Sequence, residues 1–218
     1  MKAERVNEKD ELNLRDVTRL LNIDYNKLAK EGQVEQLLNN GITKALPVQV
    51  KIDIADRKDV SINTTARLAL GNDREGNRTV QVVFKNETPQ LEKYKDIVLS
   101  TEQQNQLRKG NTLVVTDASQ REHLVKFDQE LNRVAGMKKS IVLVPERMGS
   151  PKEGYTTLTP QQQSNLKRGE AVELEIGGKK MTAQVDPIER KLNVQPSIKE
   201  SQDLKLTGTQ RKKAGPSL

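Results

Sequence analysis

The side chains that could carry out acid–base or metal chemistry are few. His123 is the only histidine, and no arrangement of serine, cysteine or paired carboxylates accompanies it, so the sequence favours a surface residue over a catalyst. Asp53, Asp56 and Asp59 offer the oxygen ligands that Mg²⁺ prefers, but this stretch is more typical of a charged turn. We therefore expect no metal, no cofactor and no enzymatic activity.

Motifs that bind phosphates or activate nucleophiles are also missing. The sequence has no Walker loop, Rossmann glycine pattern, HExxH motif or nucleophile elbow. It has no cysteine, which excludes disulfides and thiolate metal sites. Gly177 and Gly178, followed by two lysines, are explained by a two-residue hairpin turn. A small nuclease or other hydrolase is disfavoured because the acid and base pairs are missing.

Adjacent basic residues are the best candidates for binding a partner. The chain has 37 Lys and Arg against 30 Asp and Glu, a net charge of +7, and such an excess suits the phosphates of nucleic acid. A mixed solvated surface and compensation of helix dipoles are the competing explanations. The residues predicted to contact nucleic acid are Arg108, Lys109, Lys167, Arg168, Lys179 and Lys180. Further basic pairs could extend this surface: Lys138 with Lys139, Arg190 with Lys191, and Arg211 with Lys213.

The aromatic residues limit how nucleic acid could be bound. Only two Phe and three Tyr are present, with no Trp, too few for the stacking platform that single-strand binders commonly use. We therefore expect contacts with the phosphate backbone and little sequence specificity.

The sequence of residues 99–110 recurs in similar form at 158–169, about 59 positions later. Ser100 and Thr159 are predicted N-caps, and a glutamine three residues later completes a capping box in each copy. Gly110 and Gly169 then suit the left-handed residue that ends a helix. Each copy leads into segments with strand character: 112–116, 122–127 and 131–134 after the first, and 171–176, 180–185 and 191–194 after the second.

The N-terminal part has a different pattern. Apolar residues at helical spacing predict short helices within 14–21, 25–31 and 34–38, with Asp24 as a cap. These could form a helix-turn-helix or a helical cap over a sheet. The period then changes to two, which predicts an antiparallel meander over 48–54, 62–70 and 80–84. The apolar run 140–145 is the candidate for a fully buried strand.

These elements predict an α+β fold, with short N-terminal helices over an antiparallel meander followed by two repeated units of a helix and a meander. The expected divisions are a disordered start at 1–13, a first domain at 14–98, a repeat at 99–146, a linker at 147–156, a second repeat at 157–196 and a basic disordered tail at 197–218. Since no run of about 18 apolar residues occurs, we expect a soluble, cytoplasmic protein.

Two of these patterns resemble known domains. Residues 28–39 and the stretch TARLAL at 65–70 are similar to one domain of unknown function. The motif L-[ST]-x-x-Q-x-x-x-L-[KR]-[KR]-G followed by strands, as at 158–194, resembles a second domain that commonly accompanies the first. Both resemble domains on conjugative and other mobile elements of anaerobic gut bacteria, often beside type IA topoisomerases and other DNA-processing proteins. The likeness covers about residues 14–196 and implies a setting in DNA metabolism. It carries over no catalytic residue and leaves the activity open.

The expected function is that of a non-enzymatic accessory protein of a mobile genetic element, which binds nucleic acid, DNA in this setting, through its backbone. The alternative is a protein–protein adaptor that docks onto a topoisomerase, relaxase or other DNA-processing partner, through a mixed-charge sheet face or an exposed strand edge.

Overall fold

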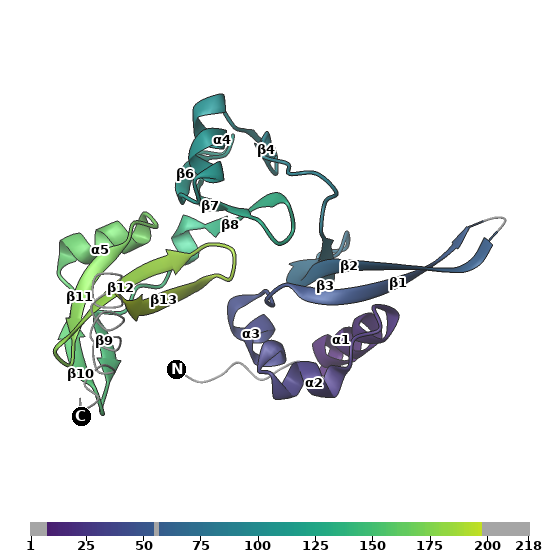
Figure 1. The fold of residues 1–218 in the computed structure, drawn as a ribbon, viewed down its shortest axis with the longest axis horizontal. Coiled ribbons are helices and arrows are strands. Elements are labelled where there is room, and N and C mark those ends of the chain that lie inside the picture. The colour runs from purple at the N-terminus through teal and green to yellow at the C-terminus, as the bar shows by residue number, and fades with distance from the viewer. Residues whose placement is uncertain (1–7, 55–56, 198–218) are drawn as a thin grey trace, which may run out of the picture.

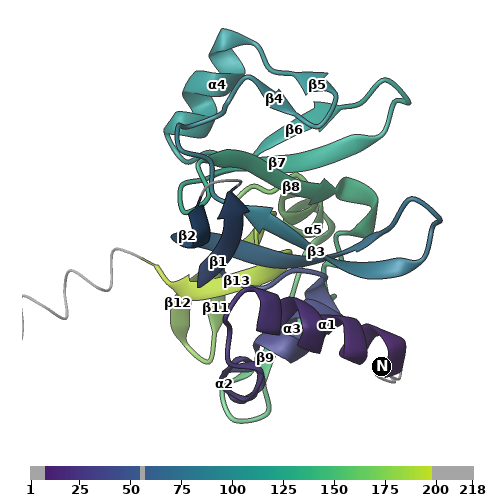
Figure 2. The ribbon, with the colours of Figure 1, turned by 90° about the vertical axis from the view of Figure 1, so that its right-hand side faces the viewer.

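The structure, a computed structural model, describes residues 8–54 and 57–197. This part of the chain contains five α-helices, one 3₁₀-helix and thirteen strands, which pair in five small antiparallel sheets (Figures 1 and 2). The fold is thus mixed helix and strand, as predicted. None of the helices within the described ranges is long and apolar enough to cross a membrane.

The first unit consists of three helices packed on a three-stranded sheet. The helices are α1 (Glu8–Leu20), α2 (Tyr25–Lys30) and α3 (Gln33–Asn40), and the strands are β1 (Leu46–Ile54), β2 (Arg57–Asn72) and β3 (Arg78–Phe84). Leu14, Leu28 and Leu37 pack with Val48 and Leu68 in its core. The apolar stripe of the helices therefore covers one face of the sheet (Figure 1).

Local signals at the ends of these helices agree with the sequence. The Asp24 carboxylate accepts hydrogen bonds from the backbone N–H groups of Asn26 and Lys27, at 2.9 and 3.2 Å, and so caps α2. The start of the chain needs a correction, because α1 begins at Glu8, inside the segment 1–13 for which the sequence predicts disorder. Residues 1–7 of that segment and 198–218 of the tail predicted at 197–218 lie outside the described residues. Ser197, where the tail is predicted to begin, is buried and donates its backbone N–H to the Lys180 carbonyl at 3.0 Å.

The second unit places one helix and a short hairpin on another three-stranded sheet. Its elements are β4 (Lys93–Tyr94), β5 (Ile97–Val98), α4 (Thr101–Arg108), β6 (Leu113–Thr116), β7 (Glu122–Asp128) and β8 (Arg133–Lys138). Its core joins Tyr94, Leu107 and Val125.

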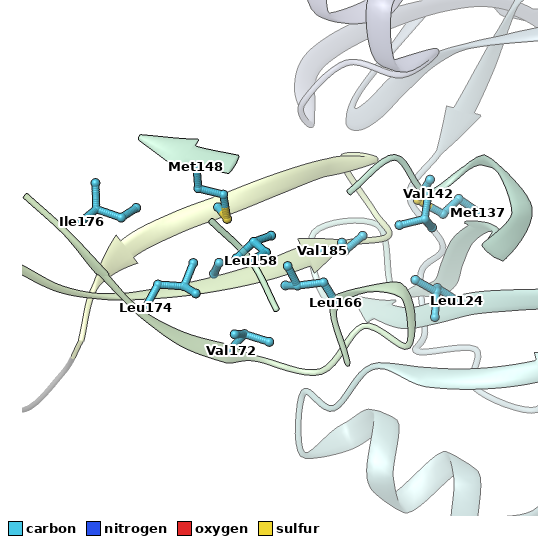
Figure 3. Packing of buried hydrophobic residues seen from close by; sticks show 11 residues of the cluster. Leu124, Met137, Val142, Met148, Leu158, Leu166, Val172, Leu174, Ile176 and Val185 are labelled. Atoms are coloured by element: carbon cyan, nitrogen blue, oxygen red, sulfur yellow. The ribbon is translucent and has the colours of Figure 1, made fainter. Parts of the chain in front are cut away.

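The third unit follows the 3₁₀-helix η1 (Lys139–Ile141). Its elements are β9 (Arg147–Ser150), β10 (Gly154–Thr157), α5 (Pro160–Lys167), β11 (Val172–Ile176), β12 (Lys179–Asp186) and β13 (Lys191–Pro196). The core of this unit is continuous with the second, because Leu124 and Met137 from the outer face of the second sheet pack with Leu166 and Val185 (Figure 3).

The predicted capping boxes are present in both helices. Ser100 Oγ accepts from the Gln103 backbone N–H at 3.3 Å, while the Gln103 side chain accepts from the Ser100 N–H at 2.9 Å. Thr159 and Gln162 make the same two bonds at 3.2 and 2.9 Å. Gly110 and Gly169 end their helices with φ of +84° and +76°. Residues at the two ends of each helix thus determine where the helix begins and ends.

Two predictions for residues 140–156 are wrong. The run 140–145 is not a buried strand: Ile141 and Leu143 are 53% and 78% exposed, and only alternate residues such as Val142 turn inward. An apolar run signals burial only if both faces are covered, and here one face is open. Residues 147–156 are not a linker either, because β9 and β10 form a hairpin. Gly149, at φ +118°, leaves no room for a Cβ against the Gly154 carbonyl, so the glycines serve close strand pairing.

A buried ion pair joins the first unit to the second. Arg67, on β2, donates to both oxygens of Asp128, at 2.8 and 3.4 Å, and to Glu130 at 2.7 Å. It also donates to the Thr43 carbonyl at 3.1 Å. The Arg67 and Asp128 side chains are 3% and 2% exposed, whereas Glu130 is 62% exposed. The guanidinium is therefore neutralised by a carboxylate from another unit.

We expect Asp128→Asn to lower the free energy of unfolding by about 3 kcal/mol or more, because Arg67 then stays buried without its full counter-charge. Asparagine retains an oxygen for the turn bonds to the backbone of Glu130 and Leu131. Urea unfolding measures the change. Glu130→Gln is the matched control, with an expected loss of less than about 1 kcal/mol because this carboxylate is exposed. Equal losses in the two variants would contradict a buried pair.

Candidate nucleic-acid interface

The end of α5 lies against the loop that follows α4. A Cβ placed on Gly169, the residue that ends α5, would lie 2.6 Å from Thr112 Cγ2, two residues after the glycine that ends α4. Each of these two neighbouring helix ends carries a basic pair. We call Arg108, Lys109, Lys167 and Arg168 the helix-end junction. All four are exposed.

The four cations of the helix-end junction are not equally available. Arg168 donates to both carboxylate oxygens of Glu170, at 2.8 and 3.2 Å, and to Asn165 at 2.8 Å. This pairing raises the pKa of Arg168 and lowers that of Glu170. Arg108 donates to the Asn105 side chain at 3.2 Å. In the described part of the chain, no ion pair or hydrogen bond engages the ammonium groups of Lys109 and Lys167.

Helix dipoles oppose part of this positive charge. Carbonyl groups that have no partner within the helix give a helix C-terminus a partial negative charge, which nearby lysines and arginines offset. The two C-termini come together at the junction, so some of the positive charge compensates backbone dipoles. Lys109 and Lys167, which lack carboxylate partners, are the residues best able to contact a phosphate.

Lys179 and Lys180 lie apart from the helix-end junction. They begin β12, at the far end of β11 from Gly169, and a five-residue strand spans roughly 15 Å. Consecutive residues of a strand also point to opposite faces. Lys180 pairs across the sheet with Glu175, and Lys179 with Ile176. Of the six predicted residues, four thus lie at the two neighbouring helix ends, and these two lie elsewhere.

His123 is buried, so the prediction of a surface residue is wrong. It lies on β7, 2% exposed, under the edge of the Tyr94 ring, with a centroid distance of 5.5 Å. Its Nε2 is 3.2 Å from the Asp117 carboxylate, while Nδ1 is buried without a hydrogen-bond partner. An Asp–His pair is half of a general-base system, but here the second ring nitrogen is closed off from solvent. Strand alternation alone could not show that α4 and β4 cover this face.

The acidic stretch at 53–59 gives no site that can be described. Asp56 lies outside the described residues, and the side chains of Asp53 and Asp59 are not described either. Among the side chains that are, no group of three or more His, Cys, Asp or Glu could hold a metal ion.

A second group of cations is only partly visible in the sequence. Lys95, Arg121, Lys138 and Arg190 come from four separate segments. Burial lowers the pKa of Lys95 most, and the positive charges of Lys138, Arg190 and Arg121 lower it further. We call these four residues the basic cluster. Lys138 and Arg190 stand out as members of basic pairs, whereas nothing in the local sequence marks Lys95 or Arg121.

Comparison with protein families gives a match to the first part of the chain. Residues 8–94 match the model of a family described as protein of unknown function (DUF4099). The match begins at the first residue of α1 and ends at the last residue of β4, and it agrees with the resemblance of this part to a domain of unknown function. No curated protein and no solved structure matches the chain.

We expect Gly169→Ala to destabilise the protein more than Gly110→Ala. Both glycines have positive φ, which costs alanine about 1–2 kcal/mol. A Cβ on Gly110 meets open space, whereas on Gly169 it meets Thr112, and overpacking adds about 1–3 kcal/mol. Urea unfolding compares the two variants. Thr112→Ser removes Cγ2 and should restore part of the loss in Gly169→Ala; equal effects of the two glycine variants would show that the helix ends do not touch.

The Asp117 carboxylate gives a pH-dependent contribution to stability. Hydrogen bonds hold its pKa below the usual range, first from the Arg121 backbone and then from the His123 and Arg121 side chains and the Ser119 backbone. A lowered folded-state pKa stabilises the protein above the unfolded-state value, near 4, and this contribution is lost as the pH falls further.

We therefore expect Asp117→Asn to be less stable than wild type at pH 7, with the difference shrinking below about pH 4. Thermal unfolding of both proteins between pH 2.5 and 7 measures this difference in stability. Asp96→Asn, at an exposed position, serves as control. A difference that stayed constant with pH would contradict the role of the ionised carboxylate.

Proposed function

We propose that the protein is a non-enzymatic accessory factor of a mobile genetic element and binds DNA through its phosphate backbone. The observation that carries the proposal is the helix-end junction, where the end of α5 lies against the loop after α4 and both helix ends carry exposed basic pairs. Its lysines have no carboxylate partners among the described residues, so they can neutralise phosphates. The contact is electrostatic and carries little sequence information.

The α4–β8 and α5–β13 segments are, in this proposal, two copies of one module. Matching hydrogen bonds support this: the Gln104 side chain donates to the Leu99 carbonyl at 3.0 Å, and that of Gln163 to the Leu158 carbonyl at 3.2 Å. Duplication would explain why basic helix ends occur in a pair.

The turns between the last two strands of the proposed modules also correspond. Asp128 and Asp186 each accept hydrogen bonds from the N–H groups two and three residues later. Asn132 and Arg190 then take the same left-handed conformation, with φ of +53° and +54°. Similar side-chain hydrogen bonding at equivalent positions supports a common origin for the two segments.

The mobile-element setting rests on the resemblance of both parts of the chain to domains found beside DNA-processing proteins. The family match at 8–94 is compatible with this setting and leaves the activity open. Within that setting the partner nucleic acid is DNA.

An adaptor that docks onto a topoisomerase, relaxase or similar protein is the second candidate. The exposed side chains of Ile141 and Leu143 favour it, because neighbouring exposed apolar residues are typical of protein interfaces. An adaptor need not bind nucleic acid, so a direct binding measurement separates the two functions.

We expect the double variant Lys109→Gln/Lys167→Gln to bind a labelled oligonucleotide more weakly and with a flatter salt dependence. Removing one lysine–phosphate interaction should reduce the slope of log K against log salt by about 0.9 for duplex DNA or about 0.7 for a single strand. Fluorescence anisotropy between 25 and 300 mM salt measures the slope.

Lys179→Gln/Lys180→Gln is the matched control, because it removes the same charge away from the junction. The proposal predicts a smaller change in its slope than in the junction variant. Equal changes would show diffuse attraction rather than an interface at the helix ends, and absence of binding at 25 mM salt would leave the adaptor as the better candidate.

A further inference from the structure

The basic cluster lies where segments of the second and third units come together. Lys95 follows β4, Arg121 is in the turn before β7, Lys138 ends β8 and Arg190 is in the turn before β13. The Lys95 ammonium is 5.3 Å from the centre of the Tyr94 ring. That ring packs on His123, which is directly opposite Lys138 in the sheet.

Arg190 is a half-buried cation without a counter-ion. One of its terminal guanidinium nitrogens donates to the Gly41 carbonyl, at 3.4 Å. Its Nε is buried and has no hydrogen-bond partner, and in the described residues no carboxylate pairs with it. Burial accordingly lowers the pKa of Arg190. A buried charge is ordinarily retained only with a partner, so the surroundings of Arg190 favour the binding of an anion.

No carboxylate beside the neighbouring cations is free to act as that anion. Across the described ranges, neither Lys95 nor Lys138 forms an ion pair with a carboxylate. Asp117 is the acid that acts on Lys95, and it is already engaged by Arg121 at 2.8 Å and by His123 at 3.2 Å. Setting the Arg121–Asp117 pair aside, three positive charges remain.

The backbone at two of these residues is held in an uncommon conformation. Lys95 and Arg190 have φ of +53° and +54°, a region that residues other than glycine, asparagine and aspartate seldom adopt. Turns account for this conformation in both residues: Lys95 is in the two-residue hairpin turn between β4 and β5, and Arg190 holds the turn position that Asn132 has in the second unit. These turns fix the backbone from which the two side chains extend.

We propose that Lys95, Lys138 and Arg190 form a phosphate-binding site separate from the helix-end junction. A guanidinium can donate two parallel hydrogen bonds to phosphate oxygens, and ammonium groups add compact positive charge. Bound phosphate would supply the counter-ion that Arg190 lacks. The phosphate belongs either to a small molecule such as a nucleotide or to a nucleic-acid backbone, and the inference holds independently of the proposed function.

The test uses the full chain, with inorganic pyrophosphate and a twelve-nucleotide single strand as separate probes at constant ionic strength. Isothermal titration calorimetry measures affinity for wild type, for Lys95→Gln/Lys138→Gln and for the control Lys30→Gln/Lys85→Gln. The control removes the same charge at exposed lysines of the first unit. We expect wild type and control to bind at least one probe, and Lys95→Gln/Lys138→Gln to bind it at least about tenfold more weakly.

Thermal unfolding without phosphate separates lost binding from lost folding. Lys95→Gln/Lys138→Gln removes repulsion between like charges, so it should unfold at the same temperature as wild type or higher. Tight pyrophosphate binding would identify a small phosphate, and binding of the oligonucleotide alone, with the same loss in the variant, would identify a backbone phosphate.

The junction variant Lys109→Gln/Lys167→Gln distinguishes this site from the proposed function. If the ligand is a small phosphate, the junction variant should leave the pyrophosphate affinity unchanged. If the ligand is a backbone phosphate, the losses of oligonucleotide affinity in the junction variant and in Lys95→Gln/Lys138→Gln should add. The proposal is overturned if neither probe binds wild type, or if Lys95→Gln/Lys138→Gln and its control bind equally well.

Discussion

The pairing of Arg67 with Asp128 is the interaction on which the arrangement of the units depends. Arg67 lies on the central strand of the first sheet, where an unpaired guanidinium would be costly. Asp128 is the last residue of β7, and the same carboxylate accepts from the Glu130 and Leu131 backbone. One side chain therefore shapes the turn that follows it and neutralises a charge in another unit. Separation of the two units would leave both charges without their partner.

The sequence predicted best the features that depend on neighbouring residues. Ser100 and Thr159 make their capping boxes through residues three positions away, and Gly110 and Gly169 satisfy a local backbone requirement. Predictions of burial from the sequence were wrong where burial depends on elements distant in the chain. Leu143 looks like a core residue but is exposed because nothing in the described chain covers its side. His123 looks like a surface residue but is buried because α4 and the Tyr94 hairpin cover its strand.

The candidate sites show the same division. The basic pairs at the helix ends follow from the sequence, but their meeting depends on the contact between Gly169 and Thr112. That Lys179 and Lys180 point to opposite faces follows from strand alternation and could have been inferred. The sequence could not predict the basic cluster, because Lys95 and Arg190 are almost a hundred positions apart. Only the packing of the second and third units brings their charges together.

The division of the apolar core has a consequence for how the molecule unfolds. The second and third units share a continuous core through Leu124 and Met137 (Figure 3). The first unit has its own core, and the side-chain hydrogen bonds of Arg67 and Arg190 tie it to the others by polar links. Polar links hold two cores together less cooperatively than a shared apolar interior does. The first unit can therefore open as a separate cooperative block, while the other two unfold together.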